Sequence, residues 1–166
     1  MIWIIAAAGA WGIVAAVAAW GIVVAAGGAA MTELSPWYYA LKKPSWQPPE
    51  WLFGPAWTVI LSLTSIAIYL GWSGASGPES RNLIVAVSAA NGIANLAWSP
   101  LFFKLRRPDW ALREVPLLWL SIVAMMAALA PVSMVASLLL LPYLAWVSFA
   151  SVLNLTIVRL NRPFGR

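Results

Sequence analysis

The stretch MVASLLLLPYLAWVSFASVLNLTIV, residues 134–158, decides the class of fold. It contains no charged residue, and as a helix it would extend about 37 Å at about 1.5 Å per residue. That length exceeds the roughly 30 Å of hydrocarbon in a bilayer. The stretch therefore predicts a membrane-spanning helix, and the rest of the chain has to be compatible with one.

Four other apolar stretches are also long enough to cross a membrane. They lie at residues 2–26, 51–72, 82–103 and 110–130. The chain of 166 residues is 63% hydrophobic and only 9% charged, whereas water-soluble domains carry charge on about a quarter of their residues. We therefore expect a single domain over residues 1–166, an all-α integral membrane bundle of five transmembrane helices.

The first of these stretches, residues 2–26, resembles a signal peptide in its length and its small-residue end. It has no basic residues at its start, and its apolar part is longer than a typical signal core, so a first membrane helix is the better interpretation. Ala8, Gly12 and Ala16 share one face of this helix. Small residues at this spacing allow close packing, which we expect within the bundle by default and across a dimer as the alternative.

Positive charge collects at one end of the predicted bundle. With five spans, the first connection, the third connection and the C-terminal tail share a face, and this face with the adjoining helix ends holds nine of the ten Lys and Arg residues. Only Arg81 lies on the other face. The positive-inside rule predicts a cytoplasmic C-terminus and an N-terminus outside. Topology thus accounts for the net charge of +5, and we expect no nucleic-acid partner.

The residue types that are absent exclude several kinds of chemistry. The chain has no Cys and no His, so disulfides, thiol nucleophiles, Cys/His zinc sites and haem ligation by these residues are excluded. Five acidic residues make a carboxylate metal site improbable, so we predict no metal and no required cofactor. No charged side chain falls at the predicted bundle centre, which argues against a proton-coupled pump or a channel with a charged filter.

Polar and aromatic side chains recur on the second, third and fifth predicted helices at membrane depth. They are Trp57, Asn91, Asn95, Trp98, Trp146, Ala150 and Asn154. The helical rise places Trp57 and Trp98 about 10 Å below the cytoplasmic boundary, and Asn91 and Trp146 about 20 Å below it. These side chains can line a space suited to a planar hydrophobic ligand. Bundle packing explains the Trp residues equally well, and interhelical hydrogen bonding explains Asn91 and Asn95 somewhat better.

Other Trp and Pro residues have simpler interpretations. Pro100, Pro116 and Pro142 have apolar neighbours and are expected to kink their helices. Five Trp residues near span ends are expected in the interfacial belt. They are Trp3, Trp37, Trp51, Trp72 and Trp110.

Three segments carry motifs that together resemble one family. They are WYYALKKPSWQPPEWLFGPAWT at residues 37–58, NLAWSPLFF at residues 95–103, and LLPYLAWVSFASVLN at residues 140–154, which is followed by RLN. In this order they resemble the translocator protein family, also called tryptophan-rich sensory or peripheral-type benzodiazepine receptor proteins. The resemblance extends from residue 37 to residue 161.

The resemblance implies a five-helix bundle, often dimeric, that binds porphyrins in a pocket under the first loop. Some members also bind sterols or synthetic aromatic ligands. It therefore implies a porphyrin-binding receptor or sensor in a bacterial inner membrane, active in tetrapyrrole homeostasis or in stress or light signalling, with a homodimer as partner. A porphyrin transporter and a light-dependent protoporphyrin-degrading enzyme are the alternatives. In some bacterial relatives two pocket tryptophans serve that degradation, and by motif position they correspond to Trp57 and Trp146.

The first loop, up to Glu50, is expected to act as a lid over this pocket. Its prolines restrict the backbone and keep it from forming a long helix, while Lys42 and Lys43 hold it at the anionic leaflet. The lid contributes four residues to the expected ligand-binding set. They are Trp37, Tyr38, Pro44 and Trp46.

One departure from the family concerns sterols. Animal members carry a Tyr just after the LN pair of the fifth helix, as part of a sterol-recognition pattern. Leu155 occupies that position here, and no Tyr lies within pattern distance of Arg159. The formal pattern occurs only in the loop, as Leu34, Tyr38 and Lys42. We therefore expect no high-affinity sterol binding.

Overall fold

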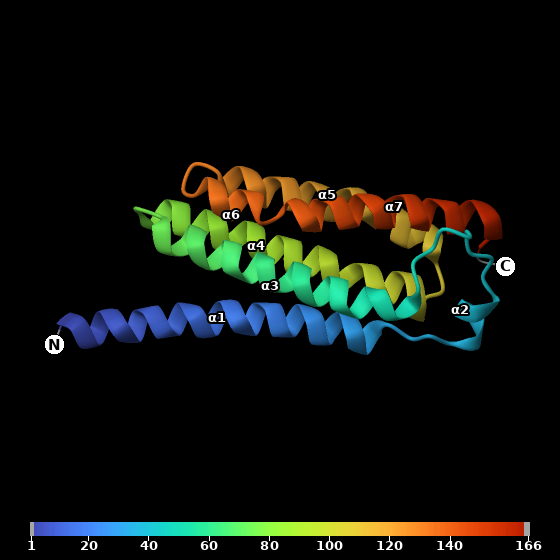
Figure 1. Ribbon diagram of the computed structural model, residues 1–166, viewed down its shortest axis with the longest axis horizontal. Helices are drawn as coiled ribbons and strands as arrows, with labels where there is room; N and C mark the ends of the chain where they lie inside the picture. Colours follow the sequence, from blue (N-terminus) through green and yellow to red (C-terminus); the bar gives the residue numbers. More distant parts are fainter. Residues whose placement is uncertain (1, 165–166) are drawn as a thin grey trace.

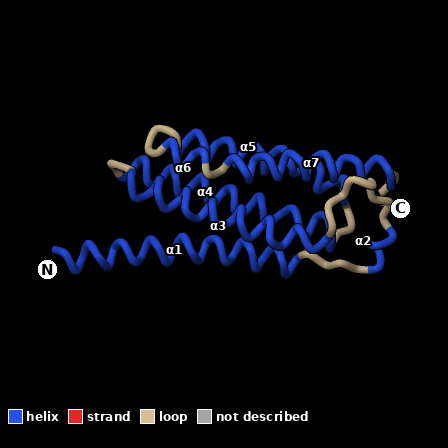
Figure 2. The backbone as a smooth tube through the Cα atoms, in the orientation of Figure 1, coloured by secondary structure: helices blue, strands red, loops and turns tan. Residues whose placement is uncertain are grey.

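The computed structural model describes the backbone of residues 2–164, together with the side chains of residue 12 and residues 14–164. The described chain is helical apart from its connections (Figures 1 and 2). The helical elements are α1 (Ile2–Met31), α2 (Pro36–Ala40), α3 (Glu50–Gly74), α4 (Pro78–Ser99), the π-helical turn η1 (Pro100–Lys104), α5 (Pro108–Leu129), α6 (Met134–Leu138) and α7 (Leu141–Asn161).

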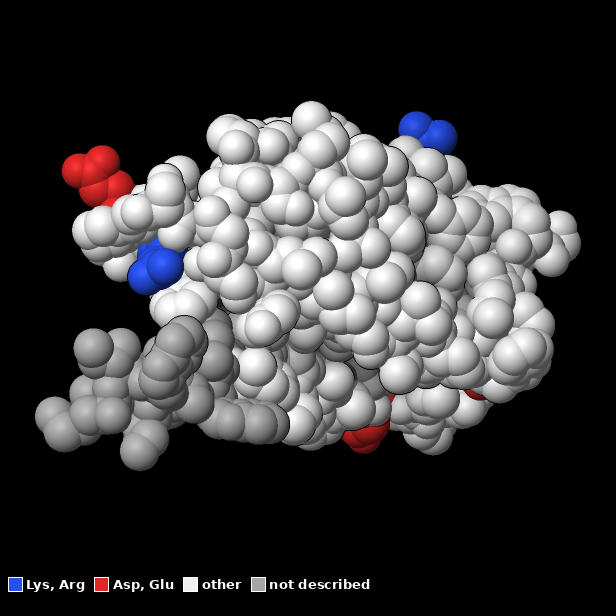
Figure 3. Space-filling model, turned by 60° about the vertical axis from the view of Figure 1, so that its left-hand side comes forward, with Lys and Arg blue, Asp and Glu red and all other residues white. Residues whose placement is uncertain are grey.

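Five helical stretches are long and apolar enough to cross a membrane, with α4 continuing through η1 and α6 continuing into α7. This confirms the predicted all-α membrane bundle of five spans. The surface agrees with a lipid environment, because the face shown in Figure 3 is largely free of charge and its few charged side chains lie at the edges. The protein is therefore an integral membrane protein.

The helices form an uneven bundle in which α5 is central. α5 packs against α4 and α7, while α1 lies on the outside against α3 and α4 (Figure 1). The core side chains of α5 repeat at helical spacing, and Ile122 and Met125 are completely buried. The first loop, the connection before α5 and the C-terminus lie at one end of the bundle.

Two helix boundaries differ from the predicted ones, at the end of α1 and within the fifth span. α1 continues to Met31 rather than ending at residue 26, because the following residues are small and apolar and the next proline is Pro36, at the start of α2. The fifth span divides into α6 and α7 two residues before Pro142. Pro142 has no N–H to bond the carbonyl of the preceding turn, and this weakens the helix there.

The other two prolines with a predicted kink behave differently from each other. Pro100 begins the π-helical turn η1, in agreement with an irregularity at that site. Pro116, in contrast, lies inside α5, which remains one continuous helix. Its ring is exposed, so the side that lacks the N–H faces away from the packed core.

The small residues of α1 do not pack as expected. A Cβ added at Gly12 would meet no atom within 4 Å, and Ala16 is exposed, so this face does not pack within the described bundle; the side chain of Ala8 lies outside the described residues. α1 approaches α4 closely instead at Gly27, where an added Cβ would lie 2.6 Å from Leu96 Cδ2, and at Gly92. A Cβ there would lie 2.9 Å from Nε1 of Trp20, which donates a hydrogen bond to the Ser88 carbonyl at 3.1 Å.

Candidate ligand-binding site

Aromatic side chains fill the seam between α3 and α7. The backbones of these two helices approach one another at few points, whereas α7 packs extensively on α5. The Trp57 ring on α3 packs edge-on against Tyr143 on α7, with 5.9 Å between centroids. One turn nearer the loop, Phe53 packs edge-on against Trp146 at 5.6 Å. Among the described residues no hydrogen bond joins α3 to α7.

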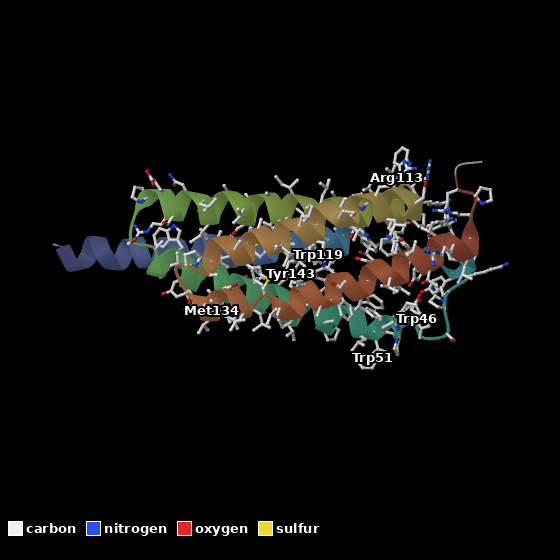
Figure 4. The ribbon with its side chains drawn as sticks, turned by 90° about the horizontal axis from the view of Figure 1, so that it is seen from above. Trp46, Trp51, Arg113, Trp119, Met134 and Tyr143 are labelled. Carbon is white, nitrogen blue, oxygen red and sulfur yellow. The ribbon has the colours of Figure 1, made fainter. Side chains whose placement is uncertain are left out.

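The first loop closes the outer end of this seam. Trp46 packs edge-on against Phe149 of α7 at 5.8 Å, and Phe149 also contacts Trp146 at 5.9 Å. Figure 4 shows Trp46 beside the loop ends of α3 and α7, with Tyr143 further along the bundle. Trp46 is 46% exposed, so it covers the seam from outside. The seam between α3 and α7, together with this cover, is called the aromatic crevice below.

A second aromatic group adjoins the crevice on the side of η1. Trp98 is stacked on Phe102 with 5.0 Å between centroids, and Trp37 meets the same Phe102 ring edge-on at 6.3 Å. Tyr38 packs on Phe103 at 5.6 Å. Phe53 and Phe149 of the crevice also pack against this group, so the aromatic surface is continuous from η1 to α7.

A buried chain of hydrogen bonds forms the back of the crevice. Asn95 Nδ2 donates to Tyr143 Oη at 2.8 Å, Tyr143 Oη donates to Asn91 Oδ1 at 3.4 Å, and Asn91 Nδ2 donates to Ser121 Oγ at 2.8 Å. The chain ends where Ser121 Oγ donates to the Leu118 carbonyl. It joins α4, α5 and α7 in hydrocarbon, where polar groups need protein partners.

The two central amides differ in what they can offer a ligand. Asn91 is completely buried, and its Nδ2 and Oδ1 are both hydrogen-bonded to other helices. Asn91 therefore serves to join helices. Asn95 is half-buried, and its Oδ1 accepts no hydrogen bond from the described residues. Asn95 is therefore the amide with a free acceptor beside the crevice.

Asn154 joins two helices through its side-chain amide. It is 2% exposed, and with its amide oriented to satisfy both atoms it donates to the Pro108 carbonyl at 3.1 Å and accepts from the Leu112 N–H at 3.2 Å. It thereby fastens α7 to the first turns of α5. Ala150, one turn nearer the crevice on α7, is half-buried.

The lid is fastened at its middle and at its far end. Asn161, at the end of α7, accepts from the Lys42 N–H and donates to the Lys42 carbonyl, both at 2.8 Å. Lys43 Nζ lies 3.5 Å from the centre of the Tyr38 ring and 3.4 Å from a carboxylate oxygen of Glu50. Burial, and secondarily the charge of Glu50, raise the pKa of Tyr38. The loop therefore has a defined conformation, while Pro44, also a predicted ligand residue, lies half-buried within it.

Sequence reasoning missed four residues of this region. Phe53, Tyr143 and Phe149 lie three or four residues from Trp57 or Trp146, so helical spacing could have identified them. Glu114, near the loop end of α5, has both carboxylate oxygens buried without a partner among the described residues. It lies two turns from Ser121 on the same side of α5, and as an acidic residue inside the predicted fourth span it could have been identified from the sequence.

The fold and the site together define a membrane-embedded five-helix protein with a lidded aromatic crevice. The sequence profile of the TspO/MBR family matches residues 6–160. The chain belongs to the TspO/MBR family.

Curated relatives agree with this membership. The chain is 48% identical over 130 residues to the tryptophan-rich protein TspO of Chlorobaculum tepidum, which covers 75% of this chain and 80% of the relative. It is 37% identical over 126 residues to the human translocator protein, covering 75% of each chain. It is 36% identical over 139 residues to a tryptophan-rich sensory protein of Cereibacter sphaeroides, covering 82% and 85%.

The hydrogen-bond chain predicts a specific loss of stability. Tyr143→Phe keeps the ring but leaves Asn95 Nδ2 and Asn91 Oδ1 without their partner, so we expect the free energy of unfolding to fall by about 1 kcal/mol. Unfolding in detergent, followed by circular dichroism, measures the change. Tyr69→Phe, the same substitution at an exposed position of α3, should change it by less than about 0.5 kcal/mol. Equal losses in the two variants would contradict the role of the Tyr143 hydroxyl.

The fastening of the lid predicts a change in protease sensitivity. Asn161→Ala removes both hydrogen bonds to Lys42, so we expect trypsin to cleave after Lys42 about tenfold faster. Mass spectrometry of timed digests measures the rate. Asn82→Ala, at an exposed position in the first turn of α4, should leave it unchanged. An unaltered rate in Asn161→Ala would show that the loop keeps its conformation without this contact.

Proposed function

We propose that this protein is a membrane receptor or sensor that binds porphyrins in the aromatic crevice. The observation that carries the proposal is the α3–α7 seam, which is lined on both sides by rings and, among the described residues, is crossed by no hydrogen bond. A flat, hydrophobic macrocycle can replace these contacts with stacking on the same rings. Family membership supports the proposal independently.

Binding requires the crevice to open. The rings of Trp57 and Tyr143, and those of Phe53 and Trp146, already touch, so a ligand has to separate them. α7 is fixed to α4 and α5 by hydrogen bonds, whereas α3 is not fixed to α7 in this way. The ligand is therefore expected to move α3 away from α7, leaving Asn95 Oδ1 as an acceptor at the back of the site.

Light-dependent degradation of protoporphyrin is the second candidate function. Trp57 and Trp146 lie on the two opposite walls of the crevice, so a porphyrin between α3 and α7 would have an indole on each side. An indole can donate an electron to an excited porphyrin. Loss of the Soret band under illumination that requires both residues would support this activity, and equal bleaching without protein would exclude it.

Porphyrin binding predicts a site-specific effect of tryptophan substitution. Trp57→Phe and Trp146→Phe each shrink a crevice wall, and we expect protoporphyrin to bind about tenfold more weakly in each. Titration of the Soret absorbance in detergent measures the dissociation constant. Trp51→Phe is the matched control, because Trp51 is 71% exposed at the start of α3. Unchanged affinity in both crevice variants would contradict the site.

The distribution of basic residues predicts the orientation of the protein in its membrane, for which we propose the bacterial inner membrane. Because the chain has no Cys, single cysteines can be placed at Ser76→Cys, in the α3–α4 connection, and at Lys104→Cys, at the opposite end. A membrane-impermeant maleimide should label the Cys at position 76 in spheroplasts and label the one at position 104 only after permeabilisation. The reverse pattern would overturn the proposed orientation.

A further inference from the structure

A separate hollow lies at the loop end of the bundle. Its volume is about 450 Å³. Three segments line it: Trp37 and Leu41 from the first loop, residues 105–107 between η1 and α5, and Asn161 at the end of α7 with residues 163 and 164 after it. None of these residues comes from the α3–α7 seam, so the hollow is a different site from the porphyrin crevice.

Two arginines of the lining differ in their partners. Arg107 donates to both carboxylate oxygens of Asp109, at 2.8 and 2.6 Å, and its guanidinium lies 4.4 Å from the centre of the Trp110 ring. Arg106 is exposed and forms no salt bridge with the described residues. Arg106 therefore supplies the uncommitted positive charge of the hollow.

The backbone at Arg106 has an unusual conformation. Its φ is +53°, in the left-handed region that residues other than glycine seldom adopt. The Arg107 N–H donates to the Leu101 carbonyl at 3.0 Å and closes the turn around it. At this position after a helix, glycine is the usual residue. An arginine that occupies it carries a conformational cost, which is typical of positions kept for function.

The remaining walls suit an amphiphile at the membrane boundary. Trp37, Leu41 and Leu105 give the hollow an apolar side, and Phe164 adds a second aromatic ring. The hollow lies where the spanning helices end, and basic residues are concentrated at this end of the bundle. Guanidinium groups pair well with phosphate, and basic residues at this depth attract anionic lipids.

We propose that this hollow binds the headgroup phosphate of an anionic phospholipid, with Arg106 as the pairing cation. Trp37 and Leu105 contact the glycerol and upper acyl region of the same lipid. The lipid bridges the first loop, the connection before α5 and the C-terminal tail. Because these segments also hold the lid through Asn161 and Lys42, lipid binding stabilises the closed lid.

Lipid-dependent stability of the purified full-length protein tests this proposal. Phosphatidylglycerol should raise the melting temperature in detergent more than phosphatidylcholine at the same mole fraction. Arg106→Gln should weaken the apparent affinity for phosphatidylglycerol about tenfold. Arg159→Gln is the matched control, since it removes the same charge from an exposed residue of the last turn of α7 that does not line the hollow. The affinity of Arg159→Gln for phosphatidylglycerol should equal that of the unmodified protein.

A second variant separates loss of binding from loss of fold. Arg106→Gly relieves the left-handed backbone, so the lipid-free melting temperature should be maintained or raised while the response to phosphatidylglycerol is lost. Equal losses of phosphatidylglycerol affinity in Arg106→Gln and Arg159→Gln, or no loss in either variant, would overturn the proposal. So would equal stabilisation by water-soluble glycerol phosphate, because the ligand would then be a free anion rather than a lipid.

Discussion

The structure depends on the hydrogen bonds that meet at the Tyr143 hydroxyl. In hydrocarbon no water replaces a lost partner, so Asn91, Asn95 and Tyr143 are stable there only when α4, α5 and α7 keep their mutual positions. Asn154 and the hydrogen bond from Trp119 to Ser148 add two further ties between α5 and α7. These three helices therefore form the fixed part of the bundle.

The position of the crevice follows from the difference between these three hydrogen-bonded helices and α3. α3 packs beside the fixed part through apolar and aromatic contacts, and the backbones of α3 and α7 approach one another at few points. Aromatic contacts can be exchanged for stacking on a ligand without leaving a polar group unpaired, which a hydrogen-bonded seam would not permit. The lid is bonded to Asn161 at the end of α7 and, through Lys43, to Glu50 at the start of α3, so it covers the seam between the two helices.

Much of the fold was predictable from the sequence, because in a membrane the length and the apolar character of a segment largely decide whether it spans. All five spans were identified, whereas the extension of α1 to Met31 and the α6–α7 break depend on local backbone chemistry that hydropathy does not report. Trp57 and Trp146 were predicted to line one space with Trp146 the deeper of the two, whereas in the structure Trp146 packs against Phe53, one turn nearer the loop than Trp57. The pairing of Asn91 with Ser121, in contrast, depends on the rotation of α5 against α4, which a single sequence does not contain.

We expect the seam between α3 and α7 to open for a ligand while the rest of the bundle stays fixed. Pulsed electron–electron double resonance between spin labels at Val59 and Val152, both exposed, measures the loop end of this seam. Labels at Tyr69 of α3 and Leu138 of α6 measure the distance at the other end of the bundle. Saturating protoporphyrin, verified by the Soret band, should lengthen the first distance and leave the second unchanged. An unchanged distance between Val59 and Val152 in the fully bound protein would contradict this opening of the seam.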